Sequence, residues 1–207
     1  MNCSRIAIGA AAVACAANVA HAGFVGYETD FSTTGGGLTV ARVYARFDSL
    51  NDVVLSVFGV QGFGSTDWND ADLAGGSWSP QFVTDAATDS YVTIGGSPGF
   101  ANTTAADPSW GGAGFNQVGI PNGAGWFNSN PPTLQGKVDA NGRTLLAQFV
   151  AIPGIIYPPG SPLTISFNQG LGTPTQFGQG SFTFLPAPGA VALLGLGALT
   201  RGRRRVG

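Results

Sequence analysis

The densest group of potential metal ligands in the chain lies within six consecutive residues. Three carboxylates and one amide occur there, at Asp67, Asn69, Asp70 and Asp72. Hard oxygen ligands at this density suit Ca²⁺. The spacing is not that of an EF-hand, because Ala71 stands where that loop needs its fifth ligand. The segment therefore predicts either a calcium site or a solvated acidic turn, and Ca²⁺ is the one cofactor that the sequence suggests.

Pairs of carboxylates are the other arrangement that could do chemistry, because two such groups can hydrolyse a glycosidic bond. Asp85 and Asp89 lie four residues apart, and Asp48 and Asp52 flank an expected turn. Asp is also a common turn residue, so neither pair stands out from a structural one. No residue is assigned a catalytic role, and a secreted glycan hydrolase ranks as the third hypothesis.

Two tryptophans lie in a long segment, 95–136, that is rich in Gly, Asn and Pro. Loops of this length without regular structure are uncommon and are either functional or disordered. Aromatic side chains are normally buried, so one interpretation is a loop whose aromatic residues cover the edge of a sheet. The other interpretation is a glycan-binding surface on which Trp110 or Trp126 stacks against a sugar ring.

Residues 1–22 have the pattern of a secretory signal peptide. Arg5 precedes an apolar stretch, and Ala20 and Ala22 form the small-residue cleavage site before Gly23. The apolar stretch is shorter than the roughly 20 residues of a membrane-spanning helix. We therefore expect export, with a mature protein that begins at Gly23.

The side chains most often used as nucleophiles, bases and zinc ligands would leave with that segment. Both cysteines, Cys3 and Cys15, and the only histidine, His21, lie in it. The mature chain would then hold no Ser-His-Asp or Cys-His pair and no thiolate or imidazole for zinc. The sequence therefore predicts a protein that is not an enzyme.

Period-two alternation of apolar residues in the body, 23–185, predicts strands. The alternating segments are 39–47, 52–59, 90–94, 145–150, 163–167 and 181–184. In the first of them Arg42 and Arg46 share the face expected to meet solvent. In the second, Val53, Leu55 and Val57 share the face expected to be buried.

Turn signals complete the prediction of the fold. Asn141-Gly142 is a strong signal for a tight hairpin turn, and residues 48–51 separate two strand segments. Seven or so short strands with polar outer faces predict an all-β fold, a single antiparallel β-sandwich or jelly-roll-like domain.

The body is acidic and the C-terminus is basic. Residues 23–185 hold all eleven acidic residues and four basic ones, a net charge of −7. An acidic body argues against nucleic-acid binding, which uses a basic face. The other basic residues after the signal segment gather at the very end, as Arg201, Arg203, Arg204 and Arg205.

The segment 186–207 combines three features in order. A proline motif, Pro186-Ala187-Pro188 followed by Gly189, precedes a short apolar run and the terminal arginines. At 1.5 Å per residue, sixteen helical residues from 185 to 200 reach about 24 Å, short of the roughly 30 Å hydrocarbon core. The segment thus predicts a short hydrophobic helix, a marginal transmembrane helix whose arginines stay cytoplasmic. A plain anchor and a buried helix are the alternatives.

This order of features resembles the PEP-CTERM sorting signal, with Ala187 in place of the usual Glu. The resemblance implies recognition by an exosortase-like sorting protease, transient contact with the inner membrane, and delivery to the cell surface or an exopolysaccharide matrix. The body is similar to uncharacterised β-rich domains found with such tails. We therefore expect an exported, non-enzymatic surface or matrix protein; a carbohydrate-binding module acting on exopolysaccharide is the alternative.

Overall fold

The computed structural model describes residues 23–61, 68–69, 78–117, 119–151 and 161–183. Nine strands in these residues form two antiparallel sheets, so the prediction of an all-β fold is confirmed. The four-stranded sheet has the order β1 (Phe24–Thr33), β2 (Thr39–Phe47), β7 (Arg143–Ala151), β4 (Tyr91–Val92). The five-stranded sheet has the order β5 (Thr104–Ala106), β6 (Ala124–Asn128), β3 (Val53–Val60), β8 (Ser161–Asn168), β9 (Gln176–Phe182).

The regular strands follow the alternation of their sequence. On β2, Ala41, Val43 and Ala45 are buried, while Arg46 on the opposite face is exposed. The predicted turn at Asn141-Gly142 leads into β7, and Gly142 has a φ of 76°, a conformation that favours glycine. Asp139 accepts hydrogen bonds from the N–H groups of Asn141 and Arg143 and so closes this turn.

The predicted inner face of β3 is only partly observed, because Val53 and Val57 are buried but Leu55 is not. Val54, Val57 and Val60 belong to the core, whereas Leu55 is half-buried. The pairing of β3 with β8 shifts register between Val54 and Ser56, and its pairing with β6 shifts again between Val57 and Val60. An extra residue in one strand reverses which side chains point inward, so simple alternation fails here.

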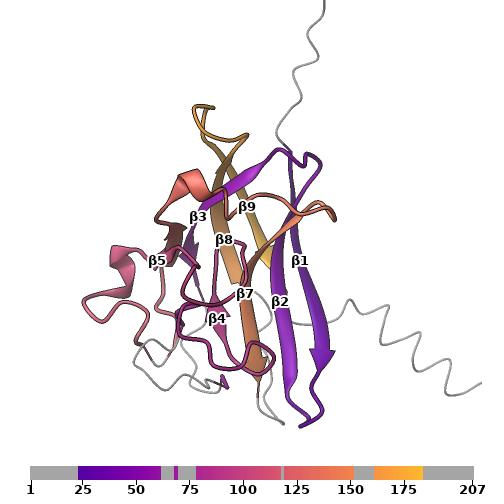
Figure 1. Ribbon diagram of the computed structural model, residues 1–207, viewed down its shortest axis with the longest axis vertical. Coiled ribbons are helices and arrows are strands. Elements are labelled where there is room, and N and C mark those ends of the chain that lie inside the picture. The colour runs from indigo at the N-terminus through magenta and orange to yellow at the C-terminus, as the bar shows by residue number, and fades with distance from the viewer. Residues whose placement is uncertain (1–22, 62–67, 70–77, 118, 152–160, 184–207) are drawn as a thin grey trace, which may run out of the picture.

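The segment 95–136 is not the long irregular loop that its composition suggested. It contains β5 and β6, which pair with each other, and β6 also pairs with β3. Two short 3-10 helices, Pro108–Trp110 (η1) and Pro131–Thr133 (η2), lie in the same segment. Figure 1 shows β5 and η1 on one side of the molecule and the long β1–β2 hairpin on the other.

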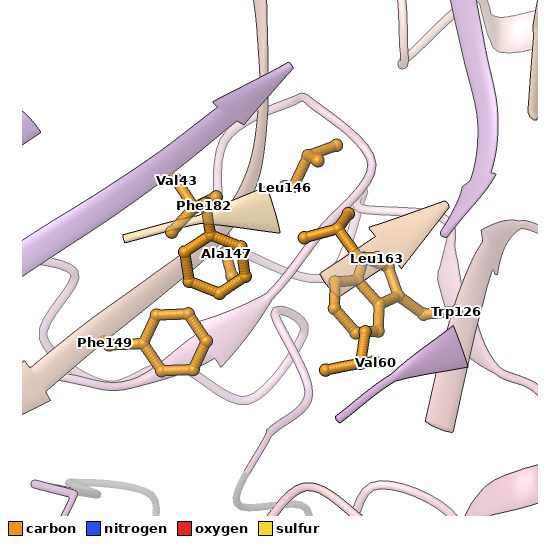
Figure 2. A pocket seen from close by; sticks show the side chains of 8 residues that line it. All are labelled: Val43, Val60, Trp126, Leu146, Ala147, Phe149, Leu163 and Phe182. Carbon is orange, nitrogen blue, oxygen red and sulfur yellow. The ribbon is translucent and has the colours of Figure 1, made fainter. Parts of the chain in front are cut away.

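Both sheets contribute to one hydrophobic core. Val43, Leu146 and Phe149 come from the four-stranded sheet, and Leu163 and Phe182 come from the five-stranded sheet. Figure 2 shows the rings of Phe149 and Phe182 next to each other and nearly parallel, with centroids 6.3 Å apart and planes at 17°. The cavity between these residues has a volume of about 10 Å³. A cavity this small with apolar walls is a packing gap and has no room for a ligand.

The first and last strands meet where the two sheets join. β1 lies against β9, although the two strands belong to different sheets. The Tyr27 hydroxyl of β1 donates to the carbonyl oxygens of Leu163 at 3.2 Å and Gly178 at 3.3 Å. Burial raises the pKa of this hydroxyl, which keeps it a donor. β1 itself was not predicted, because its sequence lacks a clean alternation of apolar and polar residues.

Candidate functional site

The two tryptophans proposed to stack on a sugar ring are buried. Trp110 is 1% exposed and Trp126 is 3% exposed. The indole N–H of Trp110 donates to the carbonyl of Gly125 at 2.6 Å, and that of Trp126 donates to the carbonyl of Thr93 at 3.0 Å. Neither ring presents a face to solvent, so the placement of these rings on a binding surface is corrected. Both tryptophan rings belong to the core, whereas Phe100 and Phe127 of the same segment are exposed.

The proposed calcium ligands fall mostly outside the described residues, namely Asp67, Asp70 and Asp72. Asn69 is described and has a structural role: its main-chain N–H donates to Val150 O at 2.7 Å, and its side-chain amide donates to Thr88 O. Within the described ranges, no group of three His, Cys, Asp or Glu side chains could hold a metal ion. The calcium site stays a prediction.

The residues of the two terminal segments also lie outside the described part of the chain. These are Ala20 and Ala22 of the cleavage site, the motif Pro186, Ala187, Pro188 and Gly189, and the arginines at 201, 203, 204 and 205. Among the residues that the structure does describe, no helix is both long enough and apolar enough to span a membrane. The sorting roles of these segments stay predictions.

Asp85, one member of the first carboxylate pair, organises a turn. Its carboxylate accepts hydrogen bonds from the Ala87 N–H at 2.9 Å and from the Thr88 hydroxyl at 2.8 Å. These two bonds lower the pKa of Asp85, since they favour the charged form. The residue therefore behaves as a turn-former, while Asp89 is buried.

In the second carboxylate pair, Asp52 has no exposed surface. Neither of its carboxylate oxygens has a hydrogen-bond partner in the described part of the chain. Burial raises the pKa of Asp52, because desolvation disfavours the charged form. A polysaccharide in solvent has no access to this carboxylate, so Asp52 is not placed to hydrolyse a glycan.

An ionic network covers the outer face of the four-stranded sheet. Arg143 of β7 lies 2.7 Å from Asp30 and 3.6 Å from Glu28, both on β1. Arg46 of β2 lies 2.7 Å from Glu28, and the Arg143 guanidinium stands 4.0 Å from the centre of the Tyr44 ring. These partly exposed pairs neutralise one another, which makes the face a poor binding site for a charged ligand.

Arg42 and Arg46 were both expected to face solvent, and they differ. Arg46 is exposed, whereas Arg42 is half-buried and its Nε donates to Oε1 of Gln148 at 2.8 Å. The amide of Gln148 in turn donates to the carbonyls of Ala86 and Asp89, at 2.9 and 2.8 Å. Arg42 therefore helps to hold the segment before β4 against β7.

The strongest candidate for a binding site is a groove beside β5, with a volume of about 330 Å³. Its walls are aromatic, small or neutral polar, and none of them is charged: Ser79, Gln81, Phe82, Thr104, Ala105, Ala106, Ala113, Gly114, Phe115 and Asn116. β5 is an edge strand of the five-stranded sheet, so the groove follows a sheet edge. The sequence analysis offered a glycan-binding surface in the segment 95–136, which supplies part of this groove, but it assigned the contact to Trp110 or Trp126.

Two exposed phenylalanines stand together at this groove. Phe82 lines it and is 38% exposed; Phe100, whose ring centre is 6.3 Å from that of Phe82, is 87% exposed. The Gln81 amide donates to the Asn102 carbonyl at 2.7 Å and links the segment of Phe82 to that of Phe100. The signal in the sequence was Phe100 itself, an aromatic residue directly after the turn residues Ser-Pro-Gly.

Comparison of the chain with protein-family models, curated proteins and solved structures found no significant match. Any function must therefore be argued from the residues and their arrangement.

Proposed function

We propose that the protein is an exported, non-enzymatic component of the cell surface or extracellular matrix, sorted by its C-terminal segment. The observation that carries the proposal is the position of the first and last described strands. β1 begins at Phe24, directly after the expected first residue of the mature chain, and β9 ends at Phe182, shortly before the motif at 186–189. Loss of 1–22 and of 186–207 would thus remove no described strand.

The packing of the body supports this division. β1 and β9 lie against each other, and Tyr27 hydrogen-bonds across them, so the strands nearest both segments are held by the body itself. The two segments then act as addresses: the first directs export, and the second enters the inner membrane briefly as a short hydrophobic helix and is cut by an exosortase-like protease. A jelly-roll-like wrapping of the two sheets is part of the same proposal.

The intact mass of the protein from its native host, with sequences of the terminal peptides, tests this function. We expect a product that begins at Gly23 and ends between Pro186 and Gly189. A product that retains the terminal arginines would mean that the protein stays anchored in the membrane and is not released. Polysaccharide turnover that disappears when one Asp is changed to Asn would overturn the non-enzymatic assignment.

The groove beside β5 favours glycan binding as a second function. Neutral hydroxyl and amide groups beside exposed aromatic rings match the chemistry of an uncharged sugar chain, which has both apolar faces and hydroxyl edges. Phe82 and Phe100 would supply the apolar contact, and Gln81 and Asn116 would supply the polar one. The ligand class is a neutral segment of exopolysaccharide.

Co-sedimentation of the protein with matrix polysaccharide tests the second function. Phe82→Ala and Phe100→Ala should each reduce the bound fraction at least about tenfold, as expected when a central aromatic contact is lost. Phe177→Ala is the matched control, because Phe177 is 66% exposed on β9, at the other edge of the same sheet. Equal binding by all three variants would exclude the groove.

A further inference from the structure

Three segments meet at one corner of the body, where β1 begins and the chain turns from β2 into β3. Gly23 precedes β1, Asp48 follows β2, and Asp52 precedes β3. The Asp48 N–H donates to the carbonyl of Gly23 at 3.0 Å. The Asp48 side chain also lies close against Gly23, since a Cβ at position 23 would overlap its carboxylate. The main chain at residue 23 is therefore packed directly on an acidic side chain.

Asp52 lies in the same corner and is fully buried, with both carboxylate oxygens lacking a hydrogen-bond partner among the described residues. The Gly23 N–H and the Gln169 side chain favour its charged form without reaching hydrogen-bond geometry, while Asp48 disfavours it. A buried carboxylate without a partner is strongly unfavourable, so proteins rarely keep one. The arrangement lacks a cation.

We propose that Asp48 and Asp52 form a binding site for the α-ammonium group that cleavage after Ala22 creates at Gly23. Hydrolysis of that peptide bond by water leaves a carboxylate on the released segment and an amine on Gly23, which takes up a proton near neutral pH. The main chain of Gly23 already lies beside both carboxylates, so the new cation appears where the charge is missing. The inference rests on the cleavage that the proposed function includes.

Glycine at position 23 lets the Asp48 carboxylate stay where it lies. Any side chain there would enter the space that the Asp48 carboxylate occupies. With glycine, the new chain end can approach both carboxylates. The same small residue also suits the position directly after the expected cleavage site. The consequence is a body that is less stable as a precursor than as a mature protein, which suits a chain that must cross the membrane before it folds.

A chain that an added protease cuts before Gly23 tests the proposal independently of native processing. A protease recognition sequence placed before Gly23 in the otherwise full chain allows the uncut and cut forms of one preparation to be compared. Cutting should raise the melting temperature of the wild-type body by about 5 °C or more, as a buried charge gains its partner. In Asp52→Asn the same cut should raise it by less than about 2 °C.

Asp85→Asn is the matched control, because it removes an exposed turn carboxylate and should respond to cutting as the wild type does. If Asp52→Asn does not fold, acetylation of the new amine in the wild-type protein replaces it and should abolish the gain. An unchanged melting temperature after cutting, or an equal shift in the wild type and Asp52→Asn, would overturn the proposal. If the protein from its native host does not begin at Gly23, the proposed cleavage after Ala22 would be wrong instead.

The pH dependence of stability gives a second readout. The groups that face Asp52 are Asp48 from the turn, Gly23 at the start of β1 and the uncharged Gln169 after β8. In the uncut chain the pKa of Asp52 is raised above 3.8, so stability should fall as pH rises through that range, since the folded state holds the proton longer. In the cut chain the ammonium lowers this pKa, and stability should rise with pH over the same range. The same slope in both forms would contradict the proposal.

Discussion

The β1–β2 hairpin and the segment 95–136 satisfy their polar groups in different ways. In the hairpin, main-chain groups pair in a continuous register from Gly26 to Thr33, and the charged side chains stand on the outer face. In the segment 95–136, short strands alternate with turns. Side-chain amides and hydroxyls there form hydrogen bonds with main-chain groups that have no partner in a neighbouring strand. Figure 1 shows these two regions on opposite sides of the molecule.

Asn102 and Gln135 are the centre of the second arrangement. The Asn102 amide donates to the Thr93 hydroxyl at 3.0 Å and to the carbonyl of Ser97 at 3.1 Å, and its oxygen accepts from the Thr104 N–H at 3.0 Å. The Gln135 amide donates to Ile94 O and to Asn102 Oδ1, each at 3.0 Å. Polar side chains are thus part of the interior here, whereas in the hairpin they lie outside it. The comparison predicts unequal costs for polar substitutions in the two regions.

The largest effect is expected for Asn102→Ala. It removes a buried amide and leaves the Thr104 N–H and neighbouring groups unsatisfied, so the free energy of unfolding should fall by about 3 kcal/mol. Asn130→Ala is the control, because Asn130 is exposed and its side chain makes no capping bond. Urea unfolding measures both. Equal losses for the two variants would mean that the interior network adds nothing.

A smaller effect is expected for Trp110→Phe. The phenyl ring fills most of the space of the indole ring, but the carbonyl of Gly125 loses the indole N–H at 2.6 Å. The free energy of unfolding should therefore fall by about 1.5 kcal/mol. Trp110 also makes an edge contact with Phe115, 5.0 Å between centres, which the Phe variant should retain. Thermal unfolding measures the difference. The Asp107 N–H also donates to this carbonyl, at 3.1 Å, so a loss below about 0.5 kcal/mol would mean that this one bond satisfies it.

Arg143→Ala tests the outer face of the hairpin. It removes the ion pairs with Glu28 and Asp30 and the contact with the Tyr44 ring, and the expected loss is about 1 kcal/mol. Because these groups are partly exposed, the loss should shrink as salt rises from 0.05 to about 1 M. Urea unfolding at the two salt concentrations measures it. A loss that does not change with salt would mean that the effect comes from packing of the aliphatic part of the Arg143 side chain.

The smallest effect is expected for Arg46→Gln. The pair between Arg46 and Glu28 is 2.7 Å long, but both side chains are substantially exposed, so the free energy of unfolding should change by less than about 0.5 kcal/mol. Melting temperature compared with the wild type measures this. A loss as large as that of Asn102→Ala would erase the difference between the two regions.

The amount that could be predicted from the sequence also differs between the two regions. β2 has the predicted bounds, and the buried face of β2 is the predicted one, because long regular alternation leaves a single register that buries the apolar side chains. β5 and β6 were missed, since three and five residues rich in Ala and Gly carry too little periodicity. The inner face of β3 was predicted only in part, because the register shift after Val54 depends on its partner strands.

The candidate sites divide in the same way. The expected cleavage site before Gly23 and the sorting motif are local patterns, which other molecules read along the chain, so residue order alone can suggest them. The groove at Phe82 and Phe100 and the corner at Gly23, Asp48 and Asp52 join segments whose contact the order of residues does not show. Local order decides strand periodicity and tight turns, because these depend on neighbouring residues. Burial of Trp110 and Trp126, and isolation of the Asp52 charge, were decided only when the two sheets packed and water was excluded.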